Sequence, residues 1–194
     1  MATLVHELVW PDRVVVGTVG SPGSRSFYLQ ARSGRRLVSV ALEKEQSALL
    51  AEKIDEILDH LMTTDGNPFS VPSSTPIELV DNEPLEQPVE QQFRTGTMSL
   101  GWDPSTVQLV IEMFPIVEAD ADDRDPFDDA DEERDERDDT VEPSEMVVVK
   151  IPVGTARAFA KRTREVVGAG RPLCPFCATP IDPEGHTCVL PDGF

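Results

Sequence analysis

The sequence has little that would place the protein outside a reducing cell interior. No apolar run approaches the length of about 18 residues that a transmembrane helix needs. The first residues, MATLVHELVWPDR, lack a basic segment followed by a long apolar run, so we expect no secretory signal. There are only three cysteines, an odd number unsuited to a disulfide framework. These absences predict a cytoplasmic protein.

Positive charge is also scarce, with 17 Lys and Arg against 36 Asp and Glu, a net charge of −19. This balance argues against broad contact with nucleic acid or anionic membranes. Residues 118–145 alone carry 16 acidic residues and three arginines, a net charge of −13. We interpret them as a solvated, disordered acidic insert. The alternative is an ion site or a decoy for a basic partner, but an EF-hand loop needs a glycine and this segment has none.

Catalytic motifs are missing too. The stretch GTVGSPGSR (17–25) lacks the Gly-Lys-Ser/Thr ending of a phosphate loop and is expected to be a hairpin turn. There is no G-x-S-x-G motif, and Asp55, Glu56 and Asp59 are expected to be solvated helix positions. We therefore predict a protein that is not an enzyme. The alternative is an enzyme with its active site in a groove between two halves, but no set of candidate catalytic residues supports it.

The apolar residues that are present follow strand and helix periods twice along the chain. Alternation and β-branched runs predict strands at 13–20, 26–32 and 36–43 before a helix at 43–62, and at 92–103, 107–118 and 146–152 before a helix at 153–170. We predict an α+β fold of two βββα halves, residues 1–62 and 93–170, forming an antiparallel sheet with both helices packed on one side. Internal duplication with pseudo-twofold symmetry is the hypothesis, and a chance match of two amphipathic helices is the alternative.

Two further segments complete this plan. Residues 63–92 contain five prolines and are predicted to be an extended linker. In the second helix, Arg157, Lys161 and Arg164 form a basic stripe. We expect it to be a solvated face resting against the acidic insert, the alternative being a docking surface for an acidic partner or nucleic acid.

The tail, residues 171–194, contains every cysteine. Cys174, Cys177, His186 and Cys188 follow the spacing C-x2-C-x8-H-x-C, with prolines and a glycine between the two pairs. Thiolates and imidazole are the ligands that zinc prefers, and four of them leave no open position, so we predict a structural zinc site. A redox C-x-x-C pair and three unconnected buried cysteines are the alternatives, and the residues do not distinguish zinc from iron.

Five stretches together resemble a known family. They are HELVWPDRVVVGTVGSPGSRSFYLQAR, VALEKEQ, FRTGTMSLGWD, the acidic insert and RPLCPFCATPIDPEGH. The sequence resembles an actinobacterial family of unknown function that includes ParJ-like proteins. Members of that family end the tail with Cys-Pro-Arg after the histidine, whereas Val189 and Leu190 follow Cys188 here, a departure that leaves the four ligands intact.

The resemblance implies an interaction with a ParA-type ATPase of chromosome partition, and it supplies no catalytic residues. We therefore expect a cytoplasmic adaptor or regulator with a structural zinc site and a ParA-type ATPase as its protein partner. The alternative is a zinc-containing nucleic-acid-binding regulator, although the tail is poor in Lys and Arg.

Overall fold

The computed structural model of the chain describes residues 3–117 and 143–170 and six residues of the tail, namely Cys174, Phe176, Cys177, Ile181, Gly185 and Cys188. The acidic insert as far as residue 142 lies outside the described residues. So does His186.

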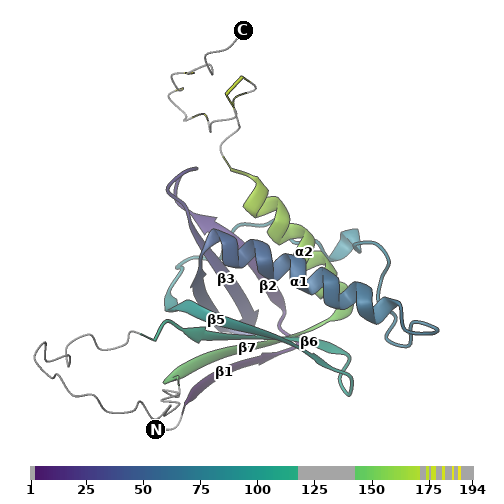
Figure 1. Cartoon of the computed structure of the whole chain (residues 1–194). Helices are drawn as coiled ribbons and strands as arrows, with labels where there is room; N and C mark the ends of the chain where they lie inside the picture. The colour runs from purple at the N-terminus through teal and green to yellow at the C-terminus, as the bar shows by residue number, and fades with distance from the viewer. Residues whose placement is uncertain are drawn as a thin grey trace, which may run out of the picture.

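Seven strands of the described residues form one sheet (Figure 1). In chain order they are β1 (Leu4–Val9), β2 (Arg13–Val19), β3 (Ser26–Ser33), β4 (Arg36–Leu42), β5 (Gln91–Asp103), β6 (Gln108–Pro115) and β7 (Glu145–Pro152). Their order across the sheet is β1-β7-β6-β5-β4-β3-β2. Neighbours are antiparallel except for two pairs, β1 with β7 and β4 with β5, which are parallel.

Two helices, α1 (Lys44–Met62) and α2 (Val153–Gly168), lie against the same face of this sheet (Figure 1). A capping box starts α1, in which the backbone N–H of Glu43 donates to Oε1 of Gln46 at 2.8 Å. The apolar stripe of each helix and the alternate side chains of the strands form one core. Its most buried members include Val16, Val40, Ile54, Leu58, Leu109, Ile111, Val149 and Ala160. Neither helix combines the length and the apolar character that crossing a lipid bilayer requires, and this statement covers the described residues.

The prediction of an α+β protein is confirmed, and both helices lie on one side of the sheet as expected. The prediction of an antiparallel sheet is wrong, because two of the strand pairs are parallel. β1 was not predicted at all. Its partner β7 is distant in the sequence, and parallel pairing leaves no hairpin signal.

The internal duplication and its pseudo-twofold symmetry stay predictions. β4, the third strand of the first half, lies beside β5, the first strand of the second half, and the two are parallel. The two halves therefore follow one another across the sheet.

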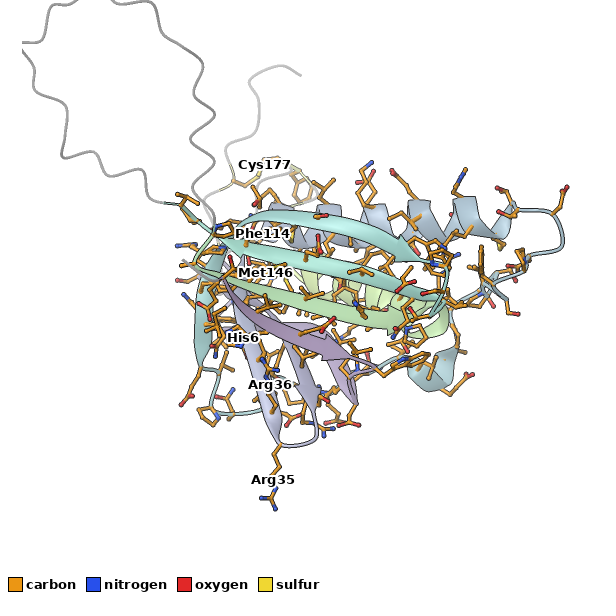
Figure 2. All side chains as sticks on the ribbon, turned by 90° about the horizontal axis from the view of Figure 1, so that it is seen from below. His6, Arg35, Arg36, Phe114, Met146 and Cys177 are labelled. Carbon is orange, nitrogen blue, oxygen red and sulfur yellow. The ribbon has the colours of Figure 1, made fainter. Side chains whose placement is uncertain are left out.

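The sheet is strongly curved, because β1 and β2 lie at opposite edges and only Trp10, Pro11 and Asp12 connect them. Figure 1 shows β2 and β3 rising out of the plane of β1, β7 and β6. Arg36 at the start of β4 consequently reaches β1, where it contacts Nδ1 of His6 at 2.9 Å (Figure 2). The other ring nitrogen of His6 lies 2.6 Å from Oε1 of Glu145. Both helices pack within this curve.

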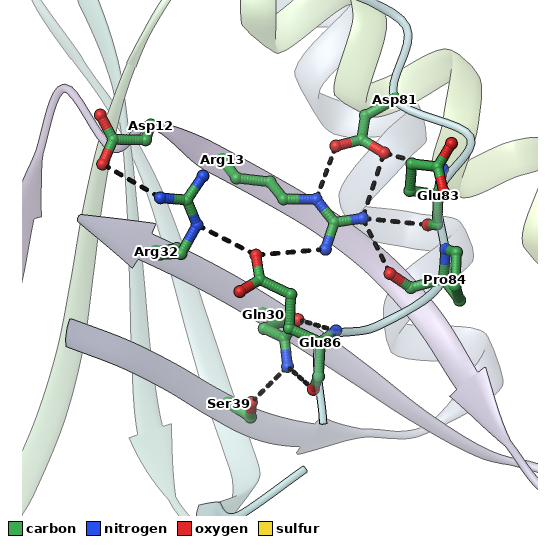
Figure 3. Close-up of polar contacts among 9 residues, drawn as sticks. All are labelled: Asp12, Arg13, Gln30, Arg32, Ser39, Asp81, Glu83, Pro84 and Glu86. Atoms are coloured by element: carbon green, nitrogen blue, oxygen red, sulfur yellow. Dashed lines mark hydrogen bonds and ion pairs between the residues drawn. The ribbon is translucent and has the colours of Figure 1, made fainter. Parts of the chain in front are cut away.

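The end of the proline-rich linker lies on the face of the sheet opposite the helices, as the contacts of Leu85 with Gly17 of β2 and of Glu86 with Gln30 of β3 show. Gln30 and Glu86 exchange two hydrogen bonds, since the Gln30 amide nitrogen donates to the Glu86 carbonyl at 3.1 Å and the Glu86 N–H donates to Oε1 of Gln30 at 2.8 Å (Figure 3). Leu85 covers Gly17 so closely that a Cβ there would lie 2.6 Å from Cγ of Leu85. A larger residue at position 17 would force the Leu85 side chain to move.

Arg13 holds the linker where it rounds the edge of β2. Its guanidinium donates to both carboxylate oxygens of Asp81, at 2.6 and 3.1 Å, and to the carbonyls of Glu83 and Pro84, at 3.0 and 2.9 Å (Figure 3). The Arg13 side chain is 11% exposed, so these bonds are partly shielded from solvent. The hydrogen bond from Arg13 lowers the pKa of Asp81 below its ordinary value of 3.8.

We expect this contact to give a pH-dependent stability. Because the folded pKa of Asp81 is depressed, its stabilisation is present above the unfolded pKa and is lost as the pH falls through the folded pKa. Asp81→Asn should cost about 1 kcal/mol at pH 7, measured by urea denaturation, and less as the pH falls below about 4. Glu83→Gln is the control, since only the backbone carbonyl of Glu83 contacts Arg13. An equal cost of Asp81→Asn at pH 7 and pH 3 would contradict the assignment.

Candidate metal centre

Three cysteines of the tail come together after the end of α2. The Sγ atoms of Cys174, Cys177 and Cys188 all lie within 4.8 Å of one another. Cys174 is buried, Cys177 is half-buried and Cys188 is exposed, and no disulfide joins them. These three residues can therefore hold a metal ion.

The spacing of the sulfurs fits a tetrahedral ion. Two thiolates bound at about 2.3 Å with a tetrahedral angle between them have sulfurs about 3.8 Å apart. The Sγ atoms of Cys174 and Cys188 lie 3.8 Å apart. The two ends of the tail segment thus approach to the distance that a shared ion requires.

The thiols influence each other's ionisation. The pKa of Cys188 is raised from 9.0 to about 11, first by its hydrogen bond with Cys177, then by desolvation, and then by Cys174. A cation among the three sulfurs would reverse this effect, because it stabilises the thiolates that metal binding requires.

The spacing predicts four ligands. The structure describes three of them, the cysteines, and places their sulfurs close together. His186 lies outside the described residues, so the fourth ligand stays a prediction. The alternative of three unconnected buried cysteines does not describe this cluster, because the sulfurs are adjacent and Cys188 is exposed.

The predicted basic stripe of α2 is solvated only in part, because the side chains of Lys161 and Arg164 are 40% and 49% exposed whereas Arg157 is buried. Arg157 is buried between the helices and donates to Oδ1 of Asp55 and Oδ1 of Asp59, both at 2.8 Å. Arg164 also pairs with Asp55, and Lys161 pairs with Glu165 of its own helix. The prediction of a solvated helix position is wrong for Asp55, whose side chain is 19% exposed and pairs with two arginines, whereas Glu56 and Asp59 are exposed as expected. A helical pattern alone does not show that the acidic stripe of one helix faces the basic stripe of the other.

The stretch at 17–25 forms the turn between β2 and β3, as predicted. These strands pair from Arg13 with Arg32 to Val19 with Ser26, and Gly20 and Gly23 have φ values of +102° and +95°. Backbone with such positive φ suits glycine and closes the hairpin. No helix follows this turn, so it is not a phosphate loop of the nucleotide-binding kind.

The fold and the cysteine cluster define the class: a mixed α+β protein with three cysteines in its tail that could hold a metal ion. The family described as "Protein of unknown function (DUF3090)" matches residues 6–188. The match covers most of the chain and reaches Cys188, so the protein belongs to the DUF3090 family. Comparisons with curated proteins and with solved structures found no match.

Proposed function

We propose that the protein is a non-enzymatic adaptor or regulator whose tail is held in shape by a structural zinc ion. The observation that carries the zinc proposal is the cluster of Cys174, Cys177 and Cys188, whose sulfurs lie within 4.8 Å of one another. His186 completes the proposed ligand set. Three thiolates and one imidazole suit zinc better than the hard cations that prefer oxygen.

A closed set of four protein ligands gives zinc a structural role. With no coordination position left for water or substrate, the ion stabilises the fold of the tail and supplies no chemistry. The sheet and helices end at Gly168, before the first ligand, so the ion orders the segment beyond them. An ordered tail is a surface that a protein partner can recognise.

The candidate partner is a ParA-type ATPase. The support for it is the resemblance to a family that includes ParJ-like proteins, together with a net charge of −19 that disfavours nucleic acid as the alternative partner. The proposed action is an effect on the assembly of that ATPase, without catalysis by this chain.

The partner proposal is tested with the zinc-loaded full chain and a ParA-type ATPase of the same organism. We expect the chain to change the fraction of ATPase that sediments in the presence of ATP, and this change should saturate as the concentration of the chain rises. An unrelated acidic protein of similar net charge is the control. No change in polymer mass at saturating protein contradicts the partner proposal, and salt-dependent retention of the chain on DNA or RNA would favour the nucleic-acid alternative.

A further inference from the structure

A small cavity lies where the first turn of α1 meets the start of β3, the end of β4 and the start of β5. Its volume is about 200 Å³. Seven of its lining residues carry polar or charged side chains that a ligand could contact: Arg25, Ser26, Tyr28, Glu43, Lys44, Gln91 and Arg94. The metal centre and the Arg13 contact with the linker are separate from it.

Three residues with cationic side chains line this cavity, and they come from three distant segments. Arg25 precedes β3 in SRSFYLQAR, Lys44 opens α1 in VALEKEQ, and Arg94 belongs to β5 in FRTGTMSLGWD. The only carboxylate of the lining is that of Glu43. Three stretches that the sequence resemblance singles out therefore contribute one cation each to a single place.

Two of these cations lack an acidic partner. Arg94 pairs with Glu43, with its Nη2 2.6 Å from Oε1 of Glu43. Among the described residues Arg25 and Lys44 make no ion pair, and the guanidinium of Arg25 lies over the ring of Phe27, 5.5 Å from its centroid. The lining thus carries three cations against one carboxylate, in a chain with 36 acidic residues against 17 Lys and Arg.

The first turn of α1 contributes only a supporting field. Its leading N–H groups already have a capping box made by Glu43 and Gln46, so they are not the site. The positive end of the helix dipole adds to the side-chain charges of Arg25, Lys44 and Arg94. The groups available to a ligand are therefore side chains of the lining residues, among which are Tyr28 and Gln91.

We propose that this cavity binds a phosphate-sized oxyanion, either free phosphate or the phosphoryl group of a small ester. Arginine forks donate paired hydrogen bonds to phosphate oxygens, and lysine adds a compact charge. A cavity of about 200 Å³ is smaller than the range of about 300 to 1,000 Å³ for whole drug-sized ligands, so the rest of an ester would extend into solvent. This site is independent of the zinc ion and of the proposed protein partner.

The test uses the full chain with ¹³C-labelled tyrosine, because Tyr28 is the only tyrosine and reports from inside the cavity. Inorganic phosphate is titrated at constant ionic strength, with chloride as the replaced anion. We expect a saturable shift of the Tyr28 ring signals. Arg25→Gln and Lys44→Gln should each weaken binding roughly tenfold, since each removes a charge-assisted contact.

Arg35→Gln is the matched control, because it removes the same charge from the exposed hairpin between β3 and β4 (Figure 2). It should change the dissociation constant by less than about twofold. A far-ultraviolet circular dichroism spectrum equal to that of the wild-type chain shows that each variant is folded. Glycerol 2-phosphate forms a second arm: similar binding assigns the site to small phosphate esters, and binding of inorganic phosphate alone assigns it to free phosphate. A shift that does not saturate, or equal weakening by Arg35→Gln, would overturn the proposal.

Discussion

Arg157→Ala should destabilise the protein by about 2 to 3 kcal/mol in urea denaturation at pH 7. Its side chain is 9% exposed and bridges Asp55 and Asp59 of the neighbouring helix. Most of the loss should come from Asp55, which is 19% exposed and loses one of its two cations, because Asp59 is 61% exposed and stays solvated. Arg164 still pairs with Asp55 in the variant, so the loss should lie at or below the lower end of the range for buried pairs.

Lys161→Ala is the matched control for this prediction. Lys161 lies on the same helix and pairs with Glu165 one turn along, but both side chains are exposed. Such a pair contributes about 0.3 to 0.5 kcal/mol. If Arg157→Ala costs no more than Lys161→Ala, the bridge does not hold α1 and α2 together.

The second large effect is expected at the cysteine cluster. Cys177→Ala should weaken zinc binding by at least about 100-fold, because even groups that only orient a metal ligand cost 10- to 100-fold when they are removed. Competition with a chromogenic chelator measures this change. His186→Ala should weaken binding similarly if this residue is the fourth ligand.

His60→Ala controls for the loss of a histidine elsewhere, since His60 lies in the last turn of α1. It should leave zinc affinity unchanged. The far-ultraviolet circular dichroism of Cys177→Ala should keep its sheet and helix signal, because those elements end before the first ligand. Undiminished zinc affinity in Cys177→Ala would remove this residue from the ligand set.

The sequence predicts local structure well where one segment determines it. The strand at 36–43 and the helix at 43–62 appear as β4 and α1 within a few residues of the expected bounds, because alternation and the helical period are local signals. The cysteine cluster is also local, since the spacing of Cys174 and Cys177 shows at once that two sulfurs can share an ion.

What the sequence did not predict depends on contacts between distant segments. β1 becomes a strand by pairing with β7, from Leu4 with Glu145 to Val9 with Lys150. Arg157 lies between the helices and donates to two aspartates of α1. The helical period of one segment does not show which other helix that segment packs against. The cavity of Arg25, Lys44 and Arg94 is likewise formed from three separate stretches, none of which indicates a site alone.

The central claim is that one zinc ion joins the ends of the tail. Native mass spectrometry of the full chain, purified without added metal or chelator, tests it most directly. We predict one zinc per chain in the wild-type protein and none in Cys177→Ala. A folded wild-type chain that carries no metal, or a Cys177→Ala chain that keeps its zinc, would contradict the account.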